Sequence, residues 1–145
     1  MKLTDHFSLN EFTDSQTAIR RGIDNSAPPD VVNNLRRVAE LLEQVRALVG
    51  KPLVVSSGYR SPALNGAIGG ARNSAHLTGL AADINAVGMR ARDLAVAIRD
   101  SGLPFDQLIH EGTWVHIGLN SGQPRREVLT AHFGGGSTTY TRGIA

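Results

Sequence analysis

The stretch SAHLTGLAAD, from Ser74 to Asp83, contains the residues with the clearest capacity for chemistry. It places His76 and Asp83 seven residues apart, with Gly79 between them. Imidazole nitrogens and carboxylate oxygens are good ligands for Zn²⁺, which in catalytic sites binds three protein groups and keeps one position open. Two ligands therefore require a third, and we predict that it is His116 in the sequence WVHI.

A predicted β-hairpin carries this third histidine. Two strand-like runs, 105–111 and 114–119, flank a Gly-Thr dipeptide, and a two-residue loop with glycine first is typical of a type II′ turn. In that register Glu111 lies diagonal to His116 on the same face, within about 8 Å. A carboxylate there could take a proton from a zinc-activated water and return it to a leaving amine, so we predict that Glu111 is the catalytic base. The alternative is a solvated hairpin residue.

Three elements are expected to position these side chains. Apolar residues recur at three- and four-residue steps over residues 31–48, which predicts a long amphipathic helix. The run LVVSS at 53–57 is rich in β-branched residues and predicts a strand. Alternation over 80–85 puts Asp83 on a second strand and leaves His76 in the turn before it. A loop histidine and a strand aspartate can converge on one ion.

The amino-terminal region, residues 3–27, predicts short helices that pack on the core. Ser8 and Asp14 are the candidate helix caps, and Gly22 and Asn25 are the candidate stops.

The other segments predict connecting and covering elements. The glycine-rich segment 58–73 predicts a loop that wraps the site. Residues 89–101 predict a second amphipathic helix, and residues 127–133 a further strand. Three glycines and a polar end of low order are expected after that strand.

The composition narrows the classes of function. The chain has 145 residues, of which 41% are hydrophobic and 19% charged, and we expect one domain spanning 1–145 that acts as a monomer. No apolar run is long enough to cross a bilayer. The absence of cysteine excludes disulfides and thiolate metal sites, and a net charge of +2 is too low to indicate nucleic acid as a partner.

Taken together, the motifs resemble the M15 family of zinc peptidases, in the subgroup of zinc D-Ala-D-Ala carboxypeptidases and murein endopeptidases. The resemblance is carried by SGYR at 57–60, by the complete pattern SxHxxGxAxD at 74–83 and by WVHI at 114–117. It covers roughly residues 4–120. It implies an α+β fold with an antiparallel sheet, flanking helices and the metal site on the sheet, similar to the LAS/hedgehog-like metallopeptidases.

The resemblance also implies roles for individual residues. One Zn²⁺ ion would be held by His76, Asp83 and His116. Arg60 and Ser74 would contact the substrate or its transition state. The substrates would be the peptides of peptidoglycan.

One departure from the family pattern concerns the catalytic acid. Several branches place a glutamate three residues before the last ligand, where this chain has Thr113, and others place a histidine two residues before it, where this chain has Trp114. Glu111 is the acid within reach, so it remains the predicted base.

Several functions fit this reading. The compact chain without a secretory signal suggests a phage or prophage endolysin, made in the cytoplasm and acting on the cell wall after release by a holin. A D-alanyl-D-alanine carboxypeptidase or a dipeptidase of the same family is the enzymatic alternative. A non-catalytic wall-binding or virion structural module is the alternative of another class, although such a module has no use for an open zinc position.

Overall fold

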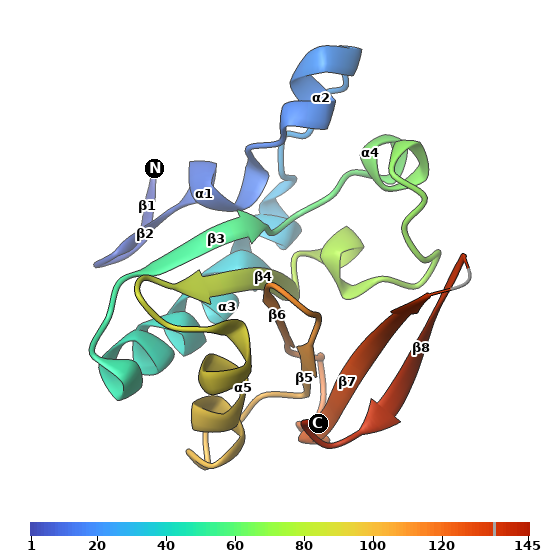
Figure 1. The fold of residues 1–145 in the computed structure, drawn as a ribbon. Coiled ribbons are helices and arrows are strands. Elements are labelled where there is room, and N and C mark those ends of the chain that lie inside the picture. The colour runs from blue at the N-terminus through green and yellow to red at the C-terminus, as the bar shows by residue number, and fades with distance from the viewer. Residues whose placement is uncertain (135) are drawn as a thin grey trace.

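A six-stranded sheet organises the chain, and its strand order is β3-β4-β6-β5-β7-β8. The computed structural model describes residues 1–134 and 136–145. Figure 1 shows helices α3 and α5 on one side of the sheet, while the C-terminal strands stand apart at its far edge. The strands are β3 (Leu53–Ser57), β4 (Ala81–Ala86), β5 (Gln107–His110), β6 (Val115–Gly118), β7 (Glu127–Gly134) and β8 (Ser137–Arg142).

The two predicted amphipathic helices are present. Helix α3 spans Pro29–Val49 and ends at Gly50, whose φ of 65° gives the left-handed conformation that often closes a helix. Helix α5 spans Ala91–Arg99. Both bury an apolar stripe in a single core cluster with the sheet. Among the residues that the structure describes, no helix has the length and apolarity needed to cross a membrane.

The sheet separates the core from the site by strand alternation. In β4, Ala82 and Ile84 are fully buried in the core cluster, whereas Asp83 between them points to the opposite face. In β6, Val115 and Ile117 likewise lie in the core. One face of the sheet is therefore free to carry polar groups.

The amino-terminal region contains more regular structure than we predicted. A small hairpin, β1 (Lys2–Thr4) and β2 (Phe7–Ser8), precedes helices α1 (Leu9–Thr13) and α2 (Gln16–Arg21). Ser8 caps α1 and Gly22 ends α2, as expected. The predicted cap Asp14 is wrong, because Ser15 caps α2 by accepting a hydrogen bond from the Ala18 amide.

The glycine-rich segment between β3 and β4 is not all loop. It contains α4 (Pro62–Ala67) and the 3-10 helix η1 (Ala75–Thr78). The side chain of Ser61 accepts a hydrogen bond from the Leu64 amide, and a proline at the first helical position needs no partner for its nitrogen. These local signals favour one short helix over the expected continuous loop.

The sheet is mainly antiparallel, as predicted, with one exception: β7 runs parallel to β5. The other four strand pairs are antiparallel. After β6 the chain passes through an irregular segment and returns alongside β5 in the same direction. Asp106 fixes the segment that leads into β7, because its carboxylate accepts hydrogen bonds from the backbone amide and the guanidinium of Arg125.

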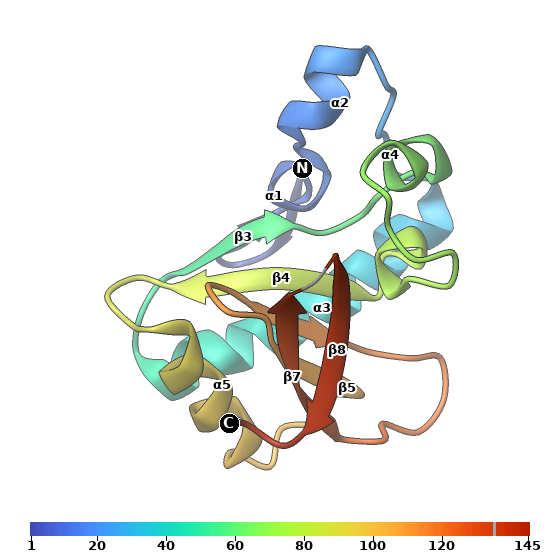
Figure 2. The same cartoon turned by 45° about the vertical axis from the view of Figure 1, so that its right-hand side comes forward.

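The expectation of a poorly ordered C-terminal end is wrong for the polar residues, whereas Gly135 of the predicted glycine run lies outside the described residues. Residues 137–142 form β8, which pairs with β7 over its whole length. Figure 2 shows this hairpin standing at a steep angle to β4. The polar character of STTYTR suggested disorder, but threonine and tyrosine fit a pleated surface well once a neighbouring strand is available.

The ionised form of Asp106 is expected to stabilise the return into β7. Hydrogen bonds from Arg125 outweigh burial and hold the pKa of Asp106 below its ordinary value of 3.8. The stability that the ionised carboxylate contributes is therefore fully present above pH 3.8. It is lost as the pH falls through the lower pKa of the folded protein. We expect Asp106→Asn to lower the free energy of unfolding at pH 7 by about 1–3 kcal/mol.

Chemical denaturation of the parent and the variant from pH 7 down to pH 3 measures this difference. The difference in free energy of unfolding between the parent and Asp106→Asn should become smaller below about pH 4. Asp5→Asn, at an exposed turn carboxylate, is the matched control. A gap of constant size over the whole range would show that Asp106 acts through its shape and not through its charge.

Candidate metal centre

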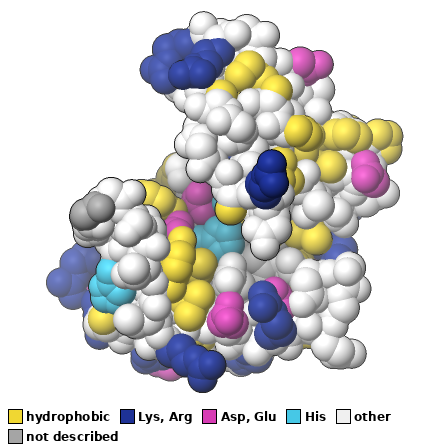
Figure 3. Space-filling view, turned by 90° about the vertical axis from the view of Figure 1, so that its right-hand side faces the viewer, with side chains coloured by type: hydrophobic (Ala, Val, Ile, Leu, Met, Phe, Trp, Pro, Cys, Tyr) yellow, Lys and Arg dark blue, Asp and Glu magenta, His cyan; other side chains and the backbone are white. Residues whose placement is uncertain are grey.

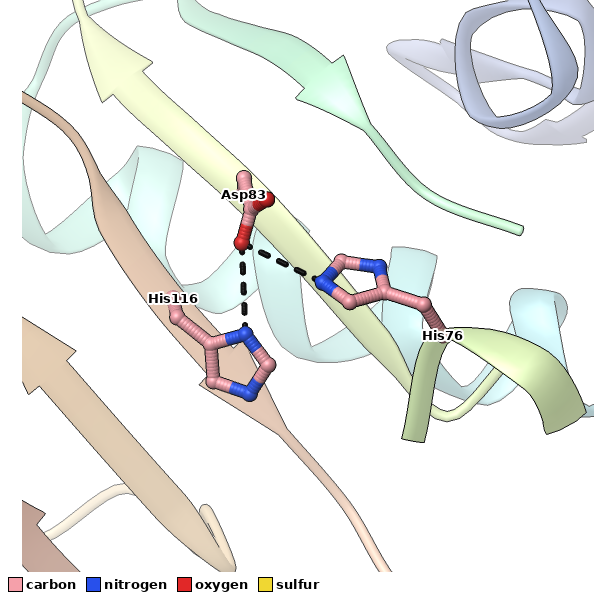
Figure 4. Close-up of side chains that lie close together, drawn as sticks. All are labelled: His76, Asp83 and His116. Atoms are coloured by element: carbon pink, nitrogen blue, oxygen red, sulfur yellow. Dashed lines mark hydrogen bonds and ion pairs between the residues drawn. The ribbon is translucent and has the colours of Figure 1, made fainter. Parts of the chain in front are cut away.

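Three predicted ligands meet on the free face of the sheet. Asp83 lies on β4 directly opposite His116 on β6, and His76 comes from η1, which precedes β4. Figure 4 shows both imidazole rings turned toward the same carboxylate oxygen. The three ligand atoms all lie within 4.8 Å of one another.

The spacing of these atoms fits a zinc ion. Asp83 Oδ1 is 3.3 Å from His76 Nε2 and 3.2 Å from His116 Nδ1. Ligands at about 2.0–2.1 Å from zinc in tetrahedral geometry lie about 3.3–3.4 Å from one another. Two imidazoles and one carboxylate are also a donor set that zinc prefers. The structure therefore provides three ligands for one Zn²⁺ ion and leaves the fourth position to solvent or substrate.

A backbone carbonyl sets the orientation of His76. His76 Nδ1 lies 2.6 Å from the carbonyl oxygen of Gly58, so this nitrogen donates its proton and Nε2 keeps its lone pair for a metal. Gly58 itself lies against α1. A Cβ at that position would come within 2.7 Å of Phe12, so only glycine allows this approach.

The loop that carries this carbonyl is clamped by Asn25. Its amide nitrogen donates to the carbonyls of Thr13 and Tyr59, at 2.9 and 3.0 Å, and its oxygen accepts from the Ser61 amide at 2.7 Å. We predicted Asn25 as a helix stop. The structure instead shows a buried side chain that connects α1 to the loop after β3.

The contact between η1 and α3 requires glycine. Gly79 closes η1 with a φ of 74°, a conformation that residues with a Cβ rarely adopt. A Cβ there would also lie 2.8 Å from the side chain of Val31 on α3. The glycine of the sequence motif thus lets the turn that carries His76 pack against the long helix.

The environment of Asp83 keeps it ionised. Burial alone would raise its pKa, but the contacts of the carboxylate with the imidazoles of His116 and His76 outweigh burial and hold the pKa well below the ordinary value. A carboxylate that is charged at neutral pH is the form that binds a cation.

Glu111 lies in the same cleft, as the hairpin register predicted. Its backbone amide donates to the Trp114 carbonyl, and its side-chain Oε2 accepts a 2.7 Å hydrogen bond from Trp114 Nε1. Burial and the negative charge of Asp83 raise the pKa of Glu111. The role of the Trp114 indole as a donor to this carboxylate was not predicted from the sequence.

Arg60 and Ser74 contact each other beside the ligands. Arg60 Nη2 donates to Ser74 Oγ at 3.0 Å, and the same oxygen accepts from the His76 amide as the cap of η1. Burial lowers the pKa of Arg60, whereas the charges of Asp83 and Glu111 favour its protonated form. Ser74 therefore orients the guanidinium as well as the turn that carries His76.

These residues line one cleft of about 770 Å³. Figure 3 shows a histidine at its floor, with acidic and hydrophobic side chains around it. The β7–β8 hairpin forms one wall through Leu129, Thr138 and Tyr140. These wall residues were missed, because no pairing partner for the C-terminal segment is visible in the sequence.

Three ligands with an open position and an adjacent carboxylate define a zinc site of the catalytic type. Residues 5–118 match the family model of Peptidase M15, which is more than half of the chain, and the protein belongs to that family. A segment of 87 residues is 36% identical to the zinc D-Ala-D-Ala carboxypeptidase of Streptomyces albus G. That segment is 60% of this chain and 33% of the relative, so the match spans about a third of the relative's length.

The geometry predicts that each ligand is needed for metal binding. His116→Ala removes one of three protein ligands and should reduce bound zinc from one ion per chain to a small fraction of that value. Elemental analysis of the purified protein after dialysis measures the zinc content. His132→Ala, at an exposed histidine of the C-terminal hairpin, is the control and should keep its zinc. A full complement of zinc in His116→Ala would contradict the ligand assignment.

Proposed function

We propose that this protein is a zinc-dependent peptidase that hydrolyses peptide bonds in the stem peptides or cross-links of peptidoglycan. The observation that carries the proposal is the convergence of His76, Asp83 and His116 in a cleft that also contains Glu111. Membership of the Peptidase M15 family supports it. When bound, zinc polarises a carbonyl and lowers the pKa of water at its open position.

Glu111 is the proposed general base. Trp114 engages its Oε2, which leaves Oε1 to accept a proton from the attacking water and to return it to the leaving amine. Burial of Glu111 in the cleft favours this exchange, because it raises the pKa of the carboxyl toward the working pH, where a general base is most effective. The hydrogen bond from the indole restricts the carboxylate to one orientation.

Arg60 is the proposed substrate anchor. Its guanidinium, held by Ser74, can bind a substrate carboxylate or the oxyanion that develops during hydrolysis. Both uses are compatible with its place in the cleft. A terminal carboxylate would be the ligand in a carboxypeptidase, and an internal carbonyl would be the ligand in an endopeptidase.

The shape of the surface favours a polymeric substrate. Arg60 and Ile68 line the zinc cleft and also a second groove of about 590 Å³ along β3. The two depressions are therefore neighbours that share Arg60 and Ile68, and an extended chain bound in one would be directed toward the other. We therefore propose an endopeptidase that acts on the cell wall, as a phage or prophage endolysin does. The named activity of the relative keeps D-Ala-D-Ala carboxypeptidase as the second candidate.

Mass spectrometry of the soluble products from purified peptidoglycan tests the proposal. The zinc-loaded protein and a chelator-treated sample are compared. New amino termini at cross-links or at L-Ala-D-Glu bonds identify an endopeptidase, and free D-Ala identifies a carboxypeptidase. Binding to the wall without any product would instead favour a non-catalytic module.

Glu111→Gln separates catalysis from metal binding and folding. The variant retains the shape of the side chain but cannot accept the proton, so kcat should fall by about 100-fold or more. Zinc content and the midpoint of thermal unfolding should match the parent. Glu40→Gln, at an exposed glutamate on α3, should keep full activity. If Glu111→Gln retains the rate of the parent, the base is another group.

A further inference from the structure

The β7–β8 hairpin follows the part of the chain that matches the family, which ends at residue 118. Its cleft-facing side can be read from the strand register. Leu129 is the partner of Ile109 in the parallel pair, and Ile109 is the partner of the ligand His116. Leu129 therefore lies on the face that carries the metal centre.

The same register places Tyr140 level with the proposed base. Two residues beyond Ile109 and Leu129 are Glu111 and Ala131, and Ala131 pairs with Tyr140 on β8. Glu111 and Tyr140 are thus separated by one strand, or about 10 Å between backbones. Both side chains line the cleft.

The strand between them carries a small residue on the cleft side. Ala131 is buried, and the cleft is lined by Glu111, Trp114 and Tyr140 around it. Tyr140 is half exposed and lines the cleft. Figure 3 shows the cleft open toward the viewer, with hydrophobic side chains along its side.

The phenol of Tyr140 is protonated at neutral pH, and its surroundings reinforce this state. Burial and the negative charge of Glu111 raise the pKa of Tyr140 above its ordinary value of 10.0. At neutral pH the hydroxyl is therefore a hydrogen-bond donor. A donor in this place complements a carbonyl or carboxylate oxygen and does not compete with Glu111 for a proton.

We infer that Tyr140 is a substrate-binding residue, whose hydroxyl donates a hydrogen bond to a carbonyl or carboxylate oxygen of the peptide on the cleft wall opposite Arg60. Arg60 follows β3 at one edge of the sheet, and Tyr140 lies on β8 at the other edge. The metal ligands on β4 and β6 lie between them. A peptide held at both walls would cross the metal centre. This inference rests on the proposed function.

Three variants test the inference. Tyr140→Phe removes only the hydroxyl, and Tyr140→Ala also removes the ring. Thr139→Ala is the matched control, because Thr139 is exposed on the same strand and alternation turns it to the opposite face. The substrates are a synthetic stem pentapeptide and a cross-linked stem-peptide dimer, and kcat and KM are measured for each protein with zinc bound.

Loss of one hydrogen bond should raise KM by about 3- to 10-fold in Tyr140→Phe. Tyr140→Ala should show a larger rise, while Thr139→Ala stays within about twofold of the parent and zinc content is unchanged throughout. Isothermal titration of the same peptides into Glu111→Gln, with and without Tyr140→Phe, should show the same weakening in Kd. This second measurement reports binding without turnover.

The outcomes separate the inference from the proposed function. An active parent whose KM is the same in Tyr140→Phe and Thr139→Ala overturns the role of Tyr140 and leaves the peptidase proposal standing. A parent that neither cleaves nor binds any of the stem peptides overturns the proposed function, and the inference with it.

Discussion

The rest of the site depends on the contacts that one carboxylate oxygen, Asp83 Oδ1, makes with two imidazole nitrogens at 3.2 and 3.3 Å. A carboxylate removed from water costs several kcal/mol unless opposite charge or hydrogen bonds compensate. His116 Nδ1 can donate a hydrogen bond to this oxygen, whereas His76 Nε2 offers a lone pair, so a divalent cation at the same point would supply the compensating charge. The sheet meets this requirement by placing Asp83 and His116 directly opposite each other on neighbouring strands.

The amino-terminal segment belongs to the metal centre as much as to the core. Phe12 accepts a hydrogen bond from the Tyr59 amide at 2.7 Å, and Asn25 holds the loop on both sides of Arg60. That loop presents the Gly58 carbonyl to His76. The fixed carbonyl acceptor at Nδ1 sets the tautomer of the His76 ring before a metal binds at Nε2. Supporting contacts of this kind typically change metal affinity about 10- to 100-fold.

The floor and the hairpin wall of the cleft come from different parts of the chain. The floor lies within the residues that match the Peptidase M15 family, whereas the β7–β8 wall follows them. The chemistry of a zinc peptidase requires the floor to keep its geometry, but the walls have only to fit a substrate. Asp106 connects the two, because it lies just before β5 and binds Arg125, which lies just before β7. The position of the wall is thereby tied to the hairpin that carries the metal ligand.

The sequence by itself determined the ligands, the long helix and the register of the hairpin. Alternation has a period of two residues and a two-residue turn fixes the pairing, so the partnership of Ile109 with His116 followed from local rules. Only the tertiary structure decided the parallel pairing of β7, the existence of β8 and the use of Asn25 as a clamp. Each of these depends on a partner distant in the chain. A backbone acceptor such as the Gly58 carbonyl has no side-chain signature, because every residue carries the same group.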